Sequence, residues 1–405
     1  MRKTSLTLTF LVFILVICHA QKFEGLAYTP PMGWNSWNTF KTNINEQLVK
    51  DIVDKIVEEG LKDAGYEYVV LDDGWMAKER DANGNLIADP IKFPNGMKAL
   101  ADYIHSKGLK FGLYNCAGSK TCAGYPGSRG YEYQDAKSYA SWDVDYLKYD
   151  WCNTDKLNAE GAYVTMRDAL YNAGRPIVFS ICEWGDNQPW KWGEKIGHLW
   201  RVTGDIINCW DCEVGHGTWS SWGIWKIINM RKQIRKASGP DHWNDFDMME
   251  VGNGMTAAED RSHFAMWSML ASPLIMGNDL RDMANETIKT LTNKEVISVN
   301  QDKLGVQGFR FTNQNNFEIW LKPLEADSWA MTFINMSDKE EVLDFDFKKH
   351  HLGDDLNGLR IDLKNNVYKI RDLFKHAEIG DTNQKLKTTI GSHDVLMVKL
   401  HKIKS

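Results

Sequence analysis

The sequence predicts a (β/α)8 barrel, the TIM barrel, followed by a C-terminal antiparallel β-sandwich domain. Short apolar strands and amphipathic helices alternate from Phe23 to about Leu304, and polar residues stand at the strand ends. After Gly305 the pattern changes to short β-rich segments separated by Asn, Asp, Gly and Lys. With 405 residues, 43% of them hydrophobic, the chain is long enough to bury a large core and a small one. We therefore expect the barrel over 21–304 and the sandwich over 305–405.

The number of strand and helix units favours a closed barrel over an open α/β sheet. Eight units, spaced at roughly 20–40 residues, fit a (β/α)8 barrel. No Gly-x-Gly-x-x-Gly loop follows the first strand, which argues against a nucleotide-binding fold. The expected strand ends are Trp34, Asp72, Tyr114, Asp150, Glu183, Asp205, Asp247 and Asn278.

The clearest barrel helix covers 44–59, where Ile, Leu and Val recur at helical spacing. Asn43, with Glu46 three residues later, predicts an N-cap and capping box, and Gly60 predicts the C-terminal end. The next unit repeats this order. It predicts a strand over 66–71, a helix over 97–107 ended by Gly108, and a strand over 109–114.

The C-terminal part is predicted to be a small β-sandwich of about 95 residues. Its short β-rich segments are bounded by turn-forming clusters. Such a domain can bind carbohydrate, but packing against the barrel and stabilising it is the preferred interpretation. The expected strands include 317–321, 329–334, 342–347 and 395–400.

The N-terminus has the pattern of a signal peptide over 1–20. Basic residues precede an apolar run that is too short to span a bilayer, and Ala20 offers a small residue for cleavage. Lipidation at Cys18 is disfavoured because Ile17 is bulky where lipoprotein signals have a small residue. The prediction is a secreted or periplasmic protein.

Charge and aromatic content narrow the class of partner. The net charge of −6 is spread along the chain in mixed sign, so we expect no binding to nucleic acid and no membrane insertion. A neutral ligand fits better. The 17 tryptophans are consistent with stacking on sugar rings, although most tryptophans fill protein cores. The oligomeric state is left open.

Removing the signal peptide leaves six of the seven cysteines, an even number that permits disulfides in an oxidising compartment. Sequence alone does not choose among the fifteen possible connectivities. Cys209 and Cys212 lack a second pair at zinc spacing, so a local disulfide is preferred over a metal or redox site.

Two acidic strand ends suit the hydrolysis of a glycosidic bond, which requires two carboxyl groups. Lys148 and Asp150 share one face of their strand, so we expect them to be neighbours, with the cation favouring the ionised carboxylate of a nucleophile. An internal salt bridge without catalysis is the alternative. Asp205 in an apolar, tryptophan-lined pocket would stay protonated, as a general acid requires. Arg201 would oppose this if paired with Asp205, so we assign it mainly to sugar hydroxyls.

Asp72 and Asp73 end a very apolar strand. Two adjacent carboxylates at such a place are costly unless they accept hydrogen bonds, and a polyhydroxylated sugar supplies donors. Helix N-caps or a hydrated turn would also account for the pair.

These motifs together resemble glycoside hydrolase family 27, the α-galactosidase or melibiase family, along almost the whole mature chain. The resemblance implies a (β/α)8 barrel with a C-terminal β domain, and double displacement with retention at the anomeric carbon. It implies no metal and no organic cofactor. The motifs that carry it are 31–37, Asp72-Asp73, 112–114, 121–124, 147–150, 182–184, Trp200-Arg201 with Asp205, and 243–248.

By this resemblance Asp150 is the nucleophile and Asp205 the acid/base. A disulfide between Cys122 and Cys152 is implied at the pocket edge. Asp72 and Asp73 are implied to bind the 4-OH and 6-OH of galactose. The implied substrate-binding set is Trp37, Asp72, Asp73, Tyr114, Cys122, Lys148, Cys152, Glu183, Trp184, Arg201 and Asp247.

The implied activity is release of terminal α-linked D-galactose from an oligosaccharide or glycan. Glu183 and Trp184 favour galactose over N-acetylgalactosamine, because related α-N-acetylgalactosaminidases have smaller residues there. The paired acids argue against a β-L-arabinopyranosidase. Phe246 and the long stretch 208–223 depart from the family pattern and leave the leaving-group preference open.

Two other classes remain as alternatives. A noncatalytic galactose-binding protein would be expected to lack an acid, yet both Asp150 and Asp205 are present. A metal-dependent barrel hydrolase would need a ligand cluster at the strand ends, and no His-x-His motif is found there. The natural oligosaccharide, its linkage, and the pairing of Cys116 and Cys182 are not predicted.

Overall fold

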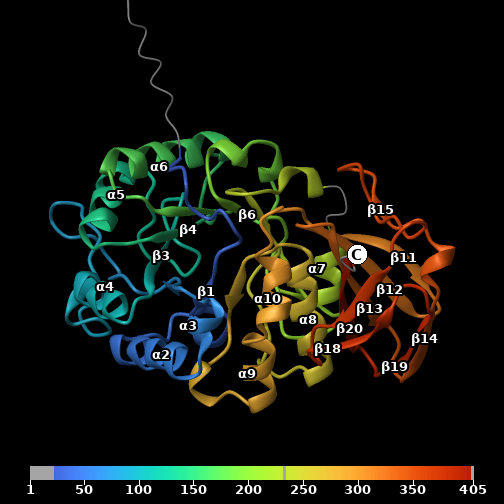
Figure 1. Cartoon of the computed structure of the whole chain (residues 1–405). Helices are drawn as coiled ribbons and strands as arrows, with labels where there is room; N and C mark the ends of the chain where they lie inside the picture. Colours follow the sequence, from blue (N-terminus) through green and yellow to red (C-terminus); the bar gives the residue numbers. More distant parts are fainter. Residues whose placement is uncertain (1–21, 231–233, 403–405) are drawn as a thin grey trace, which may run out of the picture.

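The computed structural model describes residues 22–230 and 234–402. A barrel of parallel strands occupies the N-terminal two thirds of the chain, and an antiparallel sheet lies beside it at the C-terminal end (Figure 1). The predicted signal peptide over 1–20 lies outside the described residues. Among the helices of the described part, none is both long enough and apolar enough to cross a membrane.

The predicted barrel is confirmed. Its eight strands pair in parallel in the order β10-β1-β2-β3-β4-β5-β6-β9. The barrel closes by a parallel bridge between Met249, just after β9, and Met276 in β10. The strands are β1 (Met32–Asn35), β2 (Tyr68–Leu71), β3 (Lys110–Cys116), β4 (Tyr146–Asp150), β5 (Val178–Cys182), β6 (Leu199–Arg201), β9 (Trp243–Asp245) and β10 (Leu274–Met276).

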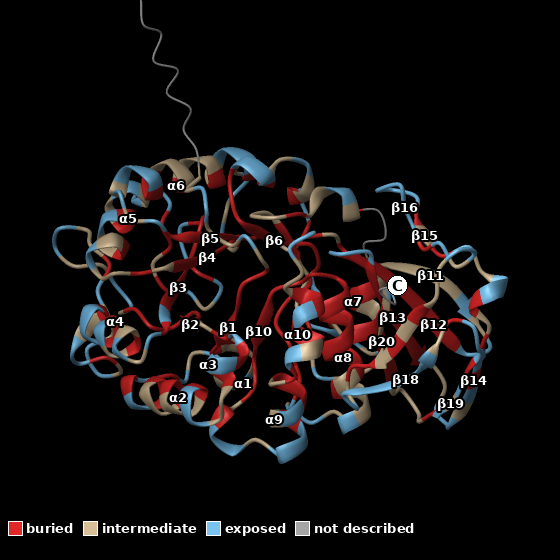
Figure 2. Cartoon of the chain, viewed as in Figure 1, coloured by how far each residue is buried: buried red, intermediate tan, exposed pale blue. Residues whose placement is uncertain are grey.

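Helices surround this sheet, whose strands are buried (Figure 2). Several of them, such as α2 and α4, bury one side and expose the other, whereas α8 is buried almost all round because it also packs against the C-terminal part. Apolar side chains between the strands and the helices form one continuous core. The α-helices of the described chain are α1 (Trp37–Phe40), α2 (Glu46–Glu58), α3 (Leu61–Ala64), α4 (Gly96–Ser106), α5 (Glu132–Ser141), α6 (Ala159–Ala173), α7 (Ile224–Met230), α8 (Ala257–Met269), α9 (Asn285–Leu291) and α10 (Lys294–Asn300).

The predicted N-cap of α2 is wrong: it lies two positions too early in the chain. Asn45, not Asn43, caps the helix by accepting a hydrogen bond from the backbone of Leu48. Asn43 still belongs to the preceding turn, where its N–H bonds to the carbonyl of Phe40. Glu46 bonds to Lys50 and Asn95 and makes no capping box. The predicted end is close: α2 stops at Glu58, just before Gly60 with its φ of +73°.

The C-terminal antiparallel part is also confirmed. A six-stranded sheet has the order β11-β12-β13-β20-β17-β18, and a two-stranded sheet, β14-β19, packs against it through a shared apolar core. The predicted strand over 342–347 is shorter, because Phe347 begins a 3-10 turn. The strands are β11 (Phe309–Gln314), β12 (Phe317–Leu324), β13 (Ser328–Asn335), β14 (Glu341–Phe345), β15 (Gly353–Asp354), β16 (Leu359–Arg360), β17 (Tyr368–Asp372), β18 (Ala377–Asp381), β19 (Leu386–Ile390) and β20 (Val395–Lys402).

The two parts share a buried interface in which α8 contacts β12, β13 and β20. Lys322 lies inside it, and its Nζ donates hydrogen bonds to the carbonyls of Ser268 and Val299 near the ends of α8 and α10. Burial lowers the pKa of Lys322 to about 7. The contact supports a packing role for the C-terminal part. The boundaries 21–304 and 305–405 stay predictions.

Candidate active site

Acidic and polar side chains gather where the carboxyl ends of the barrel strands meet. β2 is followed by Asp72 and Asp73, β4 ends in Asp150, and β5 is followed by Glu183. Asp205 follows β6, and Asp247 follows β9. Because the strands are parallel and the barrel is closed, these side chains share one face of the molecule.

Asp150 is deeply buried, with only 6% of the residue exposed. Its Oδ1 accepts a hydrogen bond from the N–H of Trp151, and its Oδ2 accepts one from the hydroxyl of Tyr114, each at 2.8 Å. Burial raises the pKa of Asp150 to about 6; the charge of Lys148 opposes this rise, and the charge of Asp205 adds to it. Asp205 is thus near enough for its charge to act on Asp150.

Lys148 favours the ionised form of Asp150, as the sequence led us to expect, but its ion pair is with another carboxylate. Its Nζ lies 2.7 Å from Oδ2 of Asp72, which also accepts a hydrogen bond from the side-chain amide of Asn35 at 2.8 Å. Strand parity places Lys148 and Asp150 on one face, but the long lysine side chain reaches across β3 to the end of β2. The ammonium therefore acts on Asp150 only through its field.

Asp73 stands beside this pair and contacts a different loop. Its Oδ2 accepts a hydrogen bond from the N–H of Ala123 at 2.8 Å. Burial raises the pKa of Asp73 to about 6, although the backbone of Ala123 and the side chain of Thr121 pull it down. The two adjacent acids are thus separately fixed by the protein, and a hydrated turn does not describe them.

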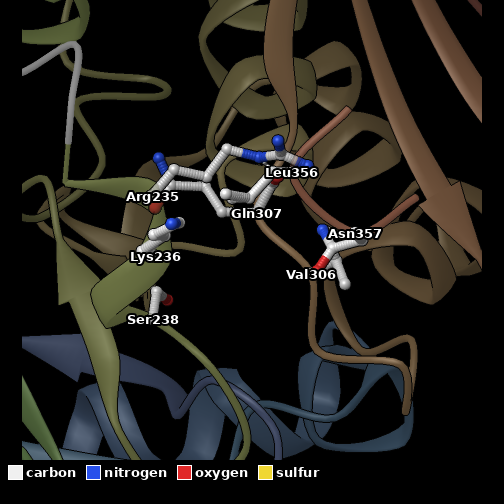
Figure 3. A pocket seen from close by; sticks show the side chains of 7 residues that line it. All are labelled: Arg235, Lys236, Ser238, Val306, Gln307, Leu356 and Asn357. Carbon is white, nitrogen blue, oxygen red and sulfur yellow. Dashed lines mark hydrogen bonds between the residues drawn. The ribbon is translucent and has the colours of Figure 1, made fainter. Parts of the chain in front are cut away.

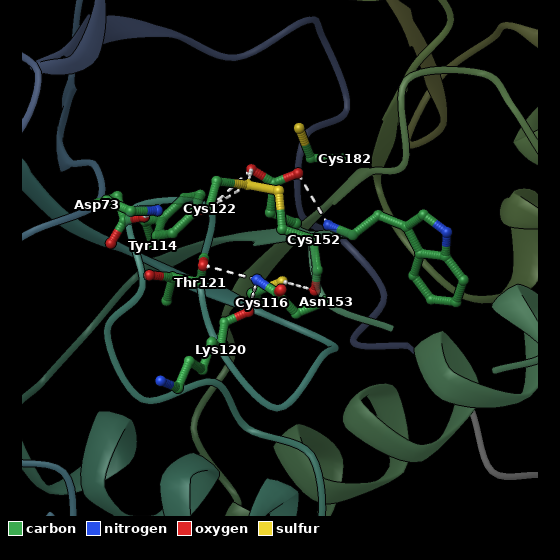
Figure 4. The surroundings of a disulfide bond; sticks show 12 residues. Asp73, Tyr114, Cys116, Lys120, Thr121, Cys122, Cys152, Asn153 and Cys182 are labelled. Atoms are coloured by element: carbon green, nitrogen blue, oxygen red, sulfur yellow. Dashed lines mark hydrogen bonds between the residues drawn. A yellow bond between two sulfur atoms is a disulfide. The ribbon is translucent and has the colours of Figure 1, made fainter. Parts of the chain in front are cut away.

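The predicted disulfide between Cys122 and Cys152 is present, with Tyr114, Cys116 and Cys182 around it (Figure 4). Cys122 Sγ lies 3.3 Å from the hydroxyl oxygen of Tyr114. The disulfide ties the loop after β3 to the residues after β4, beside Asp150. The predicted local disulfide between Cys209 and Cys212 is present as well.

Arg201 is engaged by protein carboxylates, contrary to our expectation that it would avoid Asp205. Its Nη2 lies 2.9 Å from Oδ2 of Asp247 and 3.1 Å from Oδ1 of Asp205. The Asp205 side chain is 40% exposed, so it does not lie in the enclosed apolar pocket that we predicted. The carbonyls of Thr203 and Gly204 accept hydrogen bonds from Nη2 of Arg201, so the segment that carries Asp205 is held against this guanidinium.

Asp247 is buried in an unusual backbone conformation, with φ at +83°. Its Oδ2 accepts hydrogen bonds from the N–H of Ile206 and from Arg201, and its Oδ1 accepts one from the N–H of Met248. Burial raises the pKa of Asp247, and the charge of Arg201 opposes the rise. Asp247 therefore links the end of β9 to the segment that carries Asp205.

Glu183 is fully buried, and its Oε2 accepts hydrogen bonds from the backbone and side-chain nitrogens of Asn187. Burial raises the pKa of Glu183 to about 7. Trp184 follows with a φ of +58° and is partly buried. Trp37, in α1 after the first strand, is partly exposed. Their predicted contacts with a sugar stay predictions.

Three neighbouring residues were not among the predicted site residues. Asn35 bonds to Asp72, Asp245 accepts a hydrogen bond from the N–H of Asp247, and Cys182 Sγ lies 3.8 Å from Nη1 of Arg201. Burial raises the pKa of Asp245 to about 6. All three stand at the carboxyl ends of barrel strands. The criterion that selected Asp150, a polar residue at a strand end, could therefore have selected them too.

A separate cavity of about 170 Å³ shares no residue with this group (Figure 3). Arg235 lines it, but this guanidinium is already bonded to the carboxylate of Asp354 and to the carbonyl of Gln307. Arg235 is therefore held in an ion pair within the protein, and Lys236 is a second cation that lines the cavity.

Comparison with known proteins places this fold in a family. A family profile described as "Alpha galactosidase A" matches residues 29–302, and one described as "Alpha galactosidase C-terminal beta sandwich domain" matches residues 314–400. The chain belongs to the alpha-galactosidase family. The resemblance stated from the sequence motifs is thereby confirmed, and the chain stands among the glycoside hydrolases.

Relatives in this family align along nearly the whole chain. An alpha-galactosidase A of Cellvibrio japonicus is 52% identical over 96% of each chain. An alpha-galactosidase of Cyamopsis tetragonoloba is 42% identical over 93% of this chain and 87% of its own. The solved alpha-galactosidase I of Mortierella vinacea has a TM-score of 0.86 at 34% identity, over 94% and 99% of the chains.

Proposed function

We propose that the chain is an exo-acting glycoside hydrolase that releases terminal α-linked D-galactose with retention of configuration. The observation that carries this proposal is that Asp150, at the end of β4, and Asp205, shortly after β6, both stand at the carboxyl ends of parallel strands in one barrel. Two carboxyl groups facing one site are what a retaining glycosidase needs. The named alpha-galactosidases that align with the chain, one of them solved with raffinose, support the choice of sugar.

In the first step the carboxylate of Asp150 attacks the anomeric carbon while Asp205 protonates the departing oxygen. A covalent glycosyl-enzyme forms, and the leaving group departs as an alcohol. Asp150 is held for this step by Tyr114 and the backbone of Trp151, which fix both of its oxygens.

In the second step Asp205 takes a proton from a water molecule, which attacks the same carbon and releases galactose. Two inversions give net retention, so the first product is the α-anomer. The exposed position of Asp205 suits this exchange, because both a leaving group and a water molecule must reach it.

The pocket walls support galactose among the related sugars. We propose that Asp72 and Asp73 bind the 4-OH and 6-OH, and that Trp37, Tyr114, Lys148, Arg201 and Asp247 complete the site. Glu183 is buried with Trp184 next to it, which leaves less room for an acetamido group. The two disulfides are compatible with export, and we propose a secreted or periplasmic protein.

A panel of nitrophenyl glycosides tests this function. Turnover is expected to be highest on α-galactoside, compared with α-N-acetylgalactosaminide and β-L-arabinopyranoside. Proton NMR of the first-formed sugar is expected to show the α-anomer. Preference for another glycoside would reassign the substrate, and initial release of β-galactose would contradict the double displacement.

A further inference from the structure

The chain makes a long excursion directly after Asp205. The disulfide between Cys209 and Cys212 opens it, and an antiparallel hairpin of β7 (Glu213–Gly215) and β8 (Ser220–Trp222) follows. The excursion ends at α7. Its position in the chain puts it on the side of the site where the leaving group departs, because Asp205 is the proposed proton donor.

The base of this hairpin is bonded to the Asp205 segment itself. The N–H of Trp222 donates to the carbonyl of Asp205 at 3.0 Å, and the N–H of Ile207 donates to the carbonyl of Trp222 at 3.0 Å. The indole of Trp222 packs so closely on Gly204 that a Cβ there would lie 2.1 Å from the ring. Hairpin and proposed acid therefore form one rigid unit.

The base is further anchored to both parts of the protein. Trp210 stacks on Trp225 of α7, with ring centroids 5.2 Å apart, and on His393 of the C-terminal part, at 4.6 Å. The N–H groups of Gly223 and Ile224 donate to the carbonyls of Cys212 and Cys209. A loop held in this way has a fixed direction.

The tip of the hairpin, in contrast, presents an open aromatic surface. Trp219 is 52% exposed, and its ring lies 4.1 Å from the imidazole of His216. The imidazole is itself positioned by Ser221, whose Oγ lies 2.5 Å from Nε2. Trp219 lies three positions before Trp222, so their Cα atoms are within about 10 Å. The exposed ring is thus oriented by His216, on a hairpin whose base is bonded to the Asp205 segment.

We propose that Trp219, oriented by His216, is a stacking surface for a saccharide leaving group, which makes the enzyme specific for galactose carried on a longer neutral carbohydrate. A flat aromatic face suits the apolar face of a sugar ring. Glu213 of β7 is paired with Lys226, and Asp211 is the one other acid between Cys209 and Trp222 in the sequence, so the net charge is small and a neutral occupant is favoured. This inference rests on the proposed function and extends it beyond the galactose unit.

The test compares two α-galactosyl substrates that differ in the leaving group. Raffinose carries galactose on a disaccharide, whereas α-galactosyl fluoride releases an ion that presents no ring. For Trp219→Ala, the ratio of kcat/KM on raffinose to kcat/KM on the fluoride is expected to fall about three- to tenfold. Trp219→Phe is expected to restore most of the ratio because it retains an aromatic face.

Two matched variants control for the shape of the hairpin and for the loss of an exposed ring. Val214→Ala trims an exposed apolar side chain of β7, and Tyr133→Ala removes an exposed ring from α5. Both are expected to keep the wild-type ratio. An unchanged ratio in Trp219→Ala, or an equal fall in Val214→Ala, would overturn the inference. Wild-type protein inactive on both substrates would overturn the proposed function instead.

Discussion

The two carboxyl groups proposed for the reaction occupy contrasting surroundings. Asp150 ends a five-residue strand, has both oxygens bonded, and lies beside a disulfide. Asp205 follows a three-residue strand, is 40% exposed, and pairs with Arg201. Burial sets the chemical state of the first, whereas an ion pair and an attached hairpin position the second. A nucleophile needs a fixed, dry position, and an acid/base must admit leaving group and water.

The enclosed side is tested most severely by Asp150→Asn, which removes the carboxylate with little change in shape. Activity on every α-galactoside is expected to fall by more than about 10⁴-fold, because no covalent intermediate can form. Steady-state kcat/KM on nitrophenyl α-galactoside measures this. Asp344→Asn, at an exposed position of β14, is the matched control and should keep wild-type activity. Substantial activity in Asp150→Asn would remove the assigned nucleophile.

The open side is tested by Asp205→Asn. In kcat/KM, which reports the steps up to formation of the glycosyl-enzyme, the loss is expected to be about 10²–10⁴-fold on raffinose, whose leaving oxygen needs a proton. It is expected to be much smaller on galactosyl fluoride, whose leaving ion needs none. The dependence on leaving group distinguishes the two acids, since Asp150→Asn should impair both substrates. Equal losses on both substrates in Asp205→Asn would argue that this residue positions the site rather than supplying the proton.

The two disulfides differ in the length of chain that they close, which offers a further comparison. Cys122 and Cys152 are 30 residues apart, and Cys209 and Cys212 only 3. By loop entropy, double replacement with serine should cost about 4 kcal/mol of unfolding free energy for the first pair and about 2 kcal/mol for the second. Urea unfolding of both variants measures the difference. The reverse order would mean that the short disulfide loop stabilises the protein by more than loop entropy predicts for its length.

The smallest expected effect is on the pH dependence of kcat/KM, which tests the buried carboxyl group of Asp150. Asp150 must be ionised to attack, and burial raises its pKa to about 6, so kcat/KM should fall as the pH drops below about 6. The hydroxyl of Tyr114 favours the charged form of Asp150 and lowers its pKa. Tyr114→Phe should therefore move the acid limb to higher pH, while Tyr133→Phe leaves it in place. A shift to lower pH would show that another group controls the limb.

Much of this architecture could be predicted from residue order. Period and turn residues predicted the barrel and the sheet, and the rule that acids at strand ends converge predicted Asp72, Asp150 and Asp247 in one region. The partners of the long side chains could not be predicted. Parity says that Lys148 shares a face with Asp150, but barrel curvature decides that its ammonium meets Asp72.

The same limit applies to the other differences. Arg201 meets Asp205 because the segment after β6 folds back onto the guanidinium, which bonds to the carbonyl of Gly204. Residue spacing does not predict that backbone path. The cap of α2 moved from Asn43 to Asn45 because a preceding turn claims the first residue. In both cases the sequence predicts the right type of residue, and the tertiary structure decides which residue of that type makes the contact.

Two cysteines near Asp150 remain as thiols, and their state has a consequence for redox chemistry. Cys116 Sγ lies 3.0 Å from the carbonyl of Cys152, within the immediate surroundings of a closed disulfide. Burial raises the pKa of both Cys116 and Cys182, so neither sulfur ionises readily. Since only a thiolate attacks a disulfide, the pairing between Cys122 and Cys152 is shielded from exchange by its own neighbours. The burial that raises the pKa of Asp150 thus also protects the disulfide between Cys122 and Cys152 from rearrangement.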